Sequence, residues 1–146
     1  MPPSRVKFSI RLTEEQIRSF PVSIESMWFE ESNGFYLLKN VPQFVDDLSY
    51  DDLVSLEEVG ENLYVIEKIV RPSKNSTIWI LLTDFDAKSQ VIDSITALGC
   101  GIEGGALKGY YTVNVPERVD IDTCYAFIDM SEELGLLVAD YPSIRH

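Results

Sequence analysis

The spacing of apolar residues changes midway along the chain, and this change limits the folds that the sequence can adopt. Over residues 6–12, apolar and polar residues alternate, which predicts a strand with one buried face. Over residues 91–98, apolar residues recur at the spacing of a helix with one buried stripe. The sequence therefore predicts an α+β protein whose helices are confined to its second half.

The first half, residues 1–72, is expected to form a small antiparallel β-sheet or partial barrel. Its predicted strands cover residues 6–12, 24–29, 35–38, 53–56 and 63–70. Asn33-Gly34 is a strong signal for a tight hairpin between the second and third of these strands. Pro42 follows the third strand closely, and proline cannot donate a hydrogen bond to a sheet.

The second half, residues 73–146, has the order of a ferredoxin-like β-α-β-β-α-β module. Its predicted elements are a strand at 77–82, a helix through 91–98, strands at 101–103 and 110–115, a helix from Asp120 or Asp122, and a strand at 136–141. In this arrangement both helices cover one face of a four-stranded sheet. Gly99 is expected to end the first helix. A chain of 146 residues is short enough for both modules to pack as one compact unit.

Several short motifs, none specific alone, occur in an order and spacing that together resemble a known family. They are Glu25-Ser26-Met27-Trp28, Asn40-Val41-Pro42 with Phe44, Ser49-Tyr50-x-Asp52, Arg71, Ser76-Thr77, Leu98-Gly99-Cys100, Glu103-Gly104-Gly105 and Val113-x-Val115-Pro116. The chain resembles the bacterial domain-of-unknown-function family four-two-six-five over nearly its whole length. Two positions depart from the family pattern: Asn75 replaces a histidine, and Asp51 replaces a glycine. The resemblance implies a compact bacterial domain and no particular reaction.

The charge is strongly unbalanced, with 24 acidic and 12 basic residues and a net charge of −12. This balance argues against nonspecific binding to nucleic acid or anionic membranes and favours a basic protein partner. No lysine or arginine occurs between Lys39 and Lys68. The candidate partner-binding residues of that interval are Asp46, Asp47, Tyr50, Asp51, Asp52, Glu57, Glu58 and Glu61. The alternative interpretation is a solvated acidic face that keeps the protein soluble.

We expect no catalytic residue, metal site or cofactor site. The acids lack the alternating pattern of a calcium loop, and no glycine-rich phosphate loop is present. The sole histidine is His146, at a chain end, where fraying is common. Cys100 and Cys124 fit no Cys-x-x-Cys pattern and are interpreted as small buried hydrophobes. The absence of a signal-peptide pattern and of a long apolar run indicates a cytoplasmic protein.

These observations favour an acidic binding protein that neutralises a basic partner. The typical bacterial case is an immunity protein, or antitoxin, that docks stoichiometrically on a cognate toxin, often a cationic nuclease, without itself contacting nucleic acid or membrane. One alternative is a ligand-sensing or regulatory module of the ferredoxin-like class. Another is an enzyme that uses carboxylates alone, which predicts a carboxyl group of strongly raised pKa in a pocket.

Overall fold

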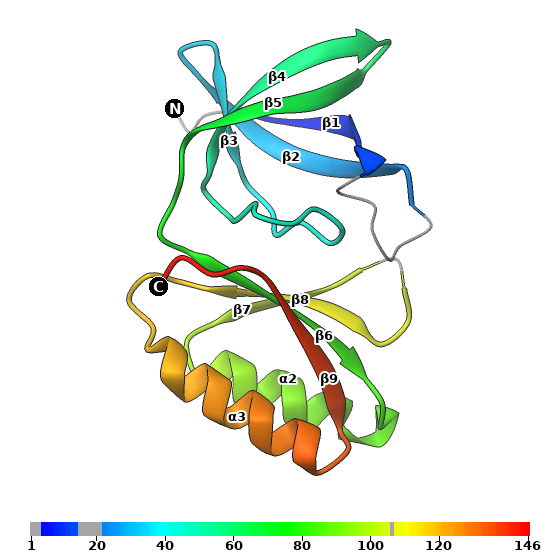
Figure 1. The fold of residues 1–146 in the computed structure, drawn as a ribbon, viewed down its shortest axis with the longest axis vertical. Helices are drawn as coiled ribbons and strands as arrows, with labels where there is room; N and C mark the ends of the chain where they lie inside the picture. The colour runs from blue at the N-terminus through cyan, green and yellow to red at the C-terminus, as the bar shows by residue number, and fades with distance from the viewer. Residues whose placement is uncertain (1–3, 15–21, 106) are drawn as a thin grey trace. The chain divides into compact units, whose positions relative to one another are not determined.

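The computed structural model describes residues 4–14, 22–105 and 107–146 (Figure 1). The chain divides into two compact units, Met1–Ser73 and Lys74–His146, called unit 1 and unit 2 below. Strands form both units, and the α-helices that lie within the described residues belong to unit 2. The expected α+β class is therefore confirmed.

Unit 1 is a closed five-stranded barrel, in which each strand pairs with its neighbours in chain order. The strands are β1 (Arg5–Arg11), β2 (Ile24–Ser32), β3 (Phe35–Leu38), β4 (Leu53–Gly60) and β5 (Leu63–Arg71). The expected small antiparallel sheet or partial barrel is corrected to a closed barrel, because β1 and β5 pair in parallel at Ser9–Leu63 and Ile10–Tyr64. Closure pairs β1 with β5, the two strands that would otherwise be the edges of this sheet, and unpaired edges are a template for aggregation.

The interior of the barrel follows from the alternation in the sequence. In β2 the side chains of Glu25, Met27 and Phe29 are buried, and those between them are exposed. The predicted turn between β2 and β3 is confirmed, since Asn33 and Gly34 have φ of 52° and 85°, as a hairpin of this kind requires.

Unit 2 is a four-stranded sheet with the strand order β7-β8-β6-β9, and all of its pairs are antiparallel. Its elements are β6 (Ser76–Leu82), the short 3₁₀ helix η1 (Phe85–Ala87), α2 (Lys88–Ala97), β7 (Gly101–Gly104), β8 (Tyr110–Val115), α3 (Ile121–Glu133) and β9 (Leu137–Ser143). Both helices lie on the same face of this sheet (Figure 1). Within the described ranges, no helix combines the length and the apolar character that membrane crossing demands.

The core of unit 2 lies between its sheet and its helices. Ile78 and Ile80 of β6 pack there with Val91 of α2 and Ile128 of α3, all essentially inaccessible to solvent. α2 ends at Ala97 with Leu98 as its C-cap, and Gly99 follows with a φ of 96°, so the predicted end of this helix is confirmed.

The C-terminus of unit 2 is held in place by hydrogen bonds. His146 Nδ1 lies 2.6 Å from Ser76 Oγ, and His146 Nε2 lies 2.8 Å from the carbonyl oxygen of Pro116. A carbonyl can only accept, so Nε2 carries a proton, and in that tautomer of the imidazole Nδ1 accepts from the Ser76 hydroxyl. Ser76 Oγ also accepts from the N–H of Arg145 at 2.8 Å. The expectation of a frayed chain end was therefore wrong.

We predict that His146→Ala lowers the free energy of unfolding by about 1–2 kcal/mol, because two hydrogen bonds are lost. Ser76→Ala should cost at least as much, since the Arg145 N–H also loses its acceptor. The double variant should lose less than the sum of the two, because both changes remove the same bond. Urea unfolding measures all three values, and a His146→Ala variant as stable as the parent would contradict the assignment.

Candidate functional site

The structure distributes the predicted partner-binding residues over two segments of unit 1. Asp46, Asp47, Tyr50, Asp51 and Asp52 lie in the loop of residues 39–52, here called the β3–β4 loop. The remaining residues, Glu57, Glu58 and Glu61, lie in the hairpin of β4 and β5. Asp51 and Asp52 of the loop interact with other groups of unit 1, whereas the acids of the hairpin are exposed to solvent.

Asp52 stabilises the backbone of unit 1 and is not a surface residue. Its side chain has no exposed area. Its Oδ2 accepts from the N–H of Ser49 at 2.9 Å, and its Oδ1 accepts from the N–H of Ser73 at 2.7 Å. A carboxylate that satisfies two backbone donors in a buried place is part of the fold. A partner would have to disrupt this structure to contact it.

Glu25, at the start of β2, is a second buried carboxylate, which the sequence analysis did not single out as a site residue. Its Oε2 accepts from the N–H of Gln43 at 2.8 Å, and its Oε1 accepts from the N–H of Phe44 at 3.0 Å. Burial raises the pKa of Glu25 from 4.5 to about 7, although these two hydrogen bonds act to lower it. The burial of Glu25 could have been predicted from the sequence, because it alternates in step with Met27 and Phe29, whose side chains point into the barrel.

Glu25 and Asp52, with the four N–H groups that they accept, are called the carboxylate latch below. Together they fix the middle and the end of the β3–β4 loop. The beginning of the loop is fixed by Asn40, whose Oδ1 accepts from the N–H of Trp28 at 2.7 Å. Motifs that are distant in the sequence are therefore hydrogen-bond partners in unit 1.

Asp51 and Tyr50 both interact with Lys39. The Lys39 ammonium lies 2.7 Å from Asp51 Oδ1 and 4.8 Å from the centre of the Tyr50 ring. Asp51 has a φ of 69°, a conformation that glycine adopts without strain. The backbone at this position therefore suits the glycine that the family resemblance implies, although this chain departs from that pattern. In this chain the side chain of Asp51 is used for an ion pair within the loop.

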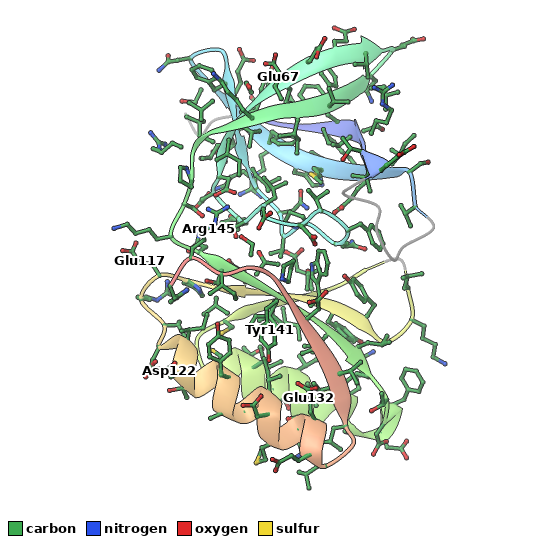
Figure 2. The ribbon with its side chains drawn as sticks, in the orientation of Figure 1. Glu67, Glu117, Asp122, Glu132, Tyr141 and Arg145 are labelled. Atoms are coloured by element: carbon green, nitrogen blue, oxygen red, sulfur yellow. The ribbon has the colours of Figure 1, made fainter. Side chains whose placement is uncertain are left out.

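The acids of the β4–β5 hairpin are exposed. Glu57 and Glu58 are consecutive in β4, so their side chains point to opposite sides of the strand. Glu61 lies in the turn, and Glu67 of β5, labelled in Figure 2, is a further exposed acid of the same interval. These side chains are available to a partner, in contrast to Asp52.

Unit 2 presents another acidic surface, which the sequence analysis did not identify. Tyr125 of α3 and Tyr141 of β9 are half-buried and form an edge-to-face pair with ring centres 5.4 Å apart. Burial raises the pKa of Tyr141, and the nearby charges of Glu132 and Asp129 raise it further. Asp122, Glu132 and Tyr141 are visible on the same side of unit 2 in Figure 2. The sequence from Ile121 to Glu133 contains no lysine or arginine.

We call Asp122, Tyr125, Asp129, Glu132 and Tyr141 the α3–β9 face. The four α3 members recur at intervals of three and four residues, which places them along one side of a helix. This spacing is visible in the sequence. The position of Tyr141 beside them depends on the tertiary structure.

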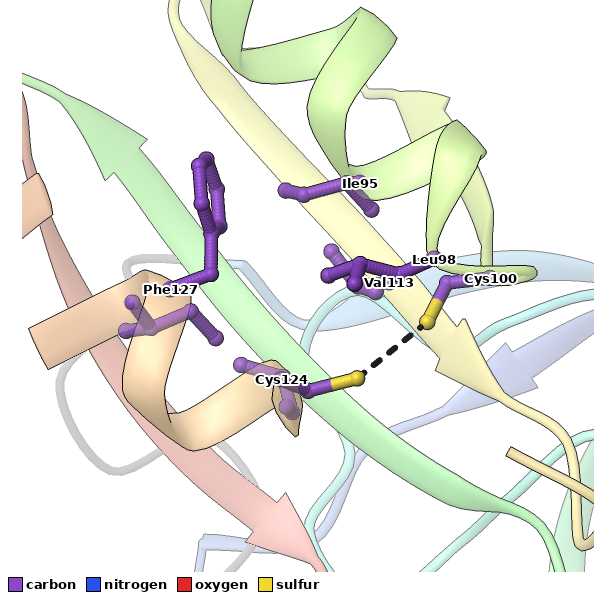
Figure 3. A pocket seen from close by; sticks show the side chains of 8 residues that line it. Ile95, Leu98, Cys100, Val113, Cys124 and Phe127 are labelled. Carbon is purple, nitrogen blue, oxygen red and sulfur yellow. Dashed lines mark hydrogen bonds between the residues drawn. The ribbon is translucent and has the colours of Figure 1, made fainter. Parts of the chain in front are cut away.

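Unit 2 has two hollows within its described residues that Glu25 does not line. One is a small apolar cavity of about 10 Å³ lined by Ile78, Ile95, Leu98, Cys100, Val113, Cys124, Phe127 and Ile128 (Figure 3). The other is an open hollow at the surface lined by Asn75, Pro116, Glu117 and Arg118. In the part of the chain that the structure describes, no three histidine, cysteine or acidic side chains gather as metal ligands would.

The fold and these surfaces define a small α+β protein with a five-stranded barrel, a buried carboxylate latch and exposed acidic faces. Residues 25–138 match the model of the family described as "Domain of unknown function (DUF4265)", and the chain belongs to this family. A solved structure described as "Novel crystal structure of a hypothetical protein from Neisseria gonorrhoeae" is similar, with a TM-score of 0.76 and 18% sequence identity. The match covers 98% of this chain and 97% of that one, which shows a common fold. No curated protein matches the sequence.

The pKa of Glu25 predicts a pH dependence of stability. The folded state holds this proton more tightly than the unfolded chain does, so stability is lost as the pH rises from about 4.5 to about 7. Relative to Glu25→Gln, which has no such proton, the parent should lose on the order of 3 kcal/mol across this window. Urea unfolding at several pH values tests this, and a pH-independent difference between the two proteins would contradict it.

The burial of Asp52 predicts that equal losses of charge have unequal effects. Asp52→Asn should destabilise the protein by about 1–3 kcal/mol, because an amide group then faces a buried N–H that needs an acceptor. Glu58→Gln removes the same charge from an exposed strand position and should change stability by less than about 0.5 kcal/mol. Thermal unfolding at neutral pH measures both. Equal effects of the two substitutions would show that Asp52 is not a structural residue.

Proposed function

We propose that this chain is an acidic cytoplasmic binding protein that neutralises a basic protein partner by stoichiometric docking. The typical protein of this kind is an immunity protein that blocks a cognate toxin, such as a cationic nuclease. The observation that carries the proposal is the α3–β9 face, where three carboxylates lie near one or the other ring of a tyrosine pair and α3 contains no basic residue.

The composition of this face suits a protein interface. Tyrosine is enriched among the residues that contribute most to binding, because its ring buries a large area at a small entropic cost. Tyr125 and Tyr141 already hold each other in one geometry, which reduces that cost further. Asp122, Asp129 and Glu132 would attract a cationic surface and accelerate association. The tyrosines thus contribute contact area, and the acids contribute complementarity.

Such a protein would act by occupying a surface and would need no reaction of its own. A nuclease cleft is cationic because it binds phosphates, and carboxylates can occupy the same positions. The exposed acids of the β4–β5 hairpin are a second candidate for this contact. Asp52 would then contribute to the proposed function only indirectly, by stabilising unit 1.

We also propose that unit 2 belongs to the ferredoxin-like class. Its order of elements is β-α-β-β-α-β. β6 and β7 run parallel to each other, and β8 lies between them and is antiparallel to both, which is the split βαβ arrangement. Tyr141 lies on β9, the strand added at the edge beside β6. In this classification the α3–β9 face is formed by the second helix of the module, α3, and its last strand, β9.

The test begins with the capture of a partner by the tagged chain from its own cells. We expect one basic protein in stoichiometric amount, and inhibition of its activity by the purified chain. The affinity of this complex is then compared for two triple variants, each of which removes three charges. Asp122→Asn with Asp129→Asn and Glu132→Gln should weaken binding at least about tenfold and reduce its salt dependence. Glu57→Gln with Glu58→Gln and Glu61→Gln should have a smaller effect.

The possible outcomes distinguish whether the chain docks on a basic protein from which of its surfaces makes the contact. A larger effect of the hairpin variant would retain the function and place the contact on unit 1. Unchanged affinity and salt dependence in both variants would contradict acidic docking. Failure to capture any basic protein, or capture without inhibition, would contradict the neutralising function.

A further inference from the structure

Cys100 and Cys124 are neighbours in the core of unit 2, although 24 positions separate them in the sequence. Their sulfur atoms lie 3.5 Å apart, as the dashed line in Figure 3 shows. Cys100 lies between α2 and β7, and Cys124 lies in the first turn of α3. Both are free thiols, with exposed fractions of 6% and 3%. The sequence alone gave no reason to pair them.

The surroundings leave room for these sulfurs to move. A disulfide requires a separation of about 2.05 Å, so the two sulfurs must approach by roughly 1.5 Å. The apolar cavity of about 10 Å³ is lined by both cysteines. Cys100 also stands between Gly99 and Gly101, the residues with the fewest restrictions on the backbone. Small rotations of the side chains, with slight backbone adjustment at Cys100, can therefore close the distance.

We propose that Cys100 and Cys124 form an oxidation site, at which a peroxide converts the two thiols into a disulfide that links the start of β7 to α3. One sulfur, as the thiolate, attacks a peroxide oxygen, and the O–O bond breaks to give a sulfenic acid and one water. The second sulfur then displaces the sulfenic oxygen as a second water, and the S–S bond forms. The two thiols lose two protons and two electrons in total, and hydrogen peroxide is reduced to two waters.

The same burial makes this reaction slow in the closed structure. Burial raises the pKa of Cys100 to about 12, so the reactive thiolate is scarce at neutral pH. The peroxide must also reach sulfurs that are almost inaccessible. Oxidation should therefore proceed through local opening of unit 2 and accelerate in urea concentrations below the unfolding transition. The pair would respond to sustained oxidation and not to brief exposure.

The experiment treats the full chain with excess hydrogen peroxide, with and without low urea, and measures its intact mass without reductant. We expect a loss of two hydrogens, a peptide that joins Cys100 to Cys124, and reversal by dithiothreitol. The melting temperature of the oxidised protein should be higher by on the order of 5–10 °C, because the disulfide closes the segment from Cys100 to Cys124 into a loop and so restricts the unfolded chain. Cys100→Ala and Cys124→Ala are the controls, and neither should lose two hydrogens within one chain.

Several results would overturn the proposal. One is the addition of oxygen to either sulfur without the loss of two hydrogens. Others are cross-linking between two chains, or no modification in low urea. A disulfide that lowers the melting temperature would show that the fold does not accommodate the bond. None of these outcomes bears on the proposed docking function, because the test involves no partner.

Discussion

Two buried carboxylates hold the long loop of unit 1 in place. Glu25 and Asp52 together accept four backbone N–H bonds, three from the β3–β4 loop and one from Ser73. A loop with so little secondary structure must satisfy its polar backbone in some other way wherever it is buried. This loop also has apolar side chains that are almost inaccessible, namely Val41, Phe44, Val45 and Leu48. Among these residues and their neighbours, the latch provides acceptors for the N–H groups of Gln43, Phe44 and Ser49.

This arrangement changes the meaning of the acidic composition. A net charge of −12 does not mean that every acid is free to contact a partner. Asp52 accepts backbone hydrogen bonds inside unit 1, and Asp51 forms an ion pair with Lys39. Burying a charged carboxylate has an energetic cost, and Glu25 shows it. Burial raises the pKa of Glu25 even though two N–H groups favour its charged form. The acids of the β4–β5 hairpin and of the α3–β9 face stay exposed, and on the α3–β9 face they accompany an ordered aromatic pair.

The sequence predicted those features that depend on neighbouring residues. The hairpin at Asn33-Gly34 and the helix end at Gly99 follow from local backbone preferences, and the α+β class follows from periodicity. The missed features depend on contacts between distant residues. Closure of the barrel requires β1 to meet β5, and the pairing of Cys100 with Cys124 requires the residue before β7 to lie beside the first turn of α3. The role of Asp52 was hidden for the same reason, because its partner Ser73 is 21 positions away.

Hydrogen exchange of individual backbone amides tests the carboxylate latch most directly. The account predicts that the N–H groups of Gln43, Phe44, Ser49 and Ser73 exchange as slowly as those in the strands of unit 1, although all four lie outside regular secondary structure. In Glu25→Gln, protection should fall at Gln43 and Phe44 more than at Ser49. Exchange of these four amides at the rate of an unstructured chain would contradict the latch.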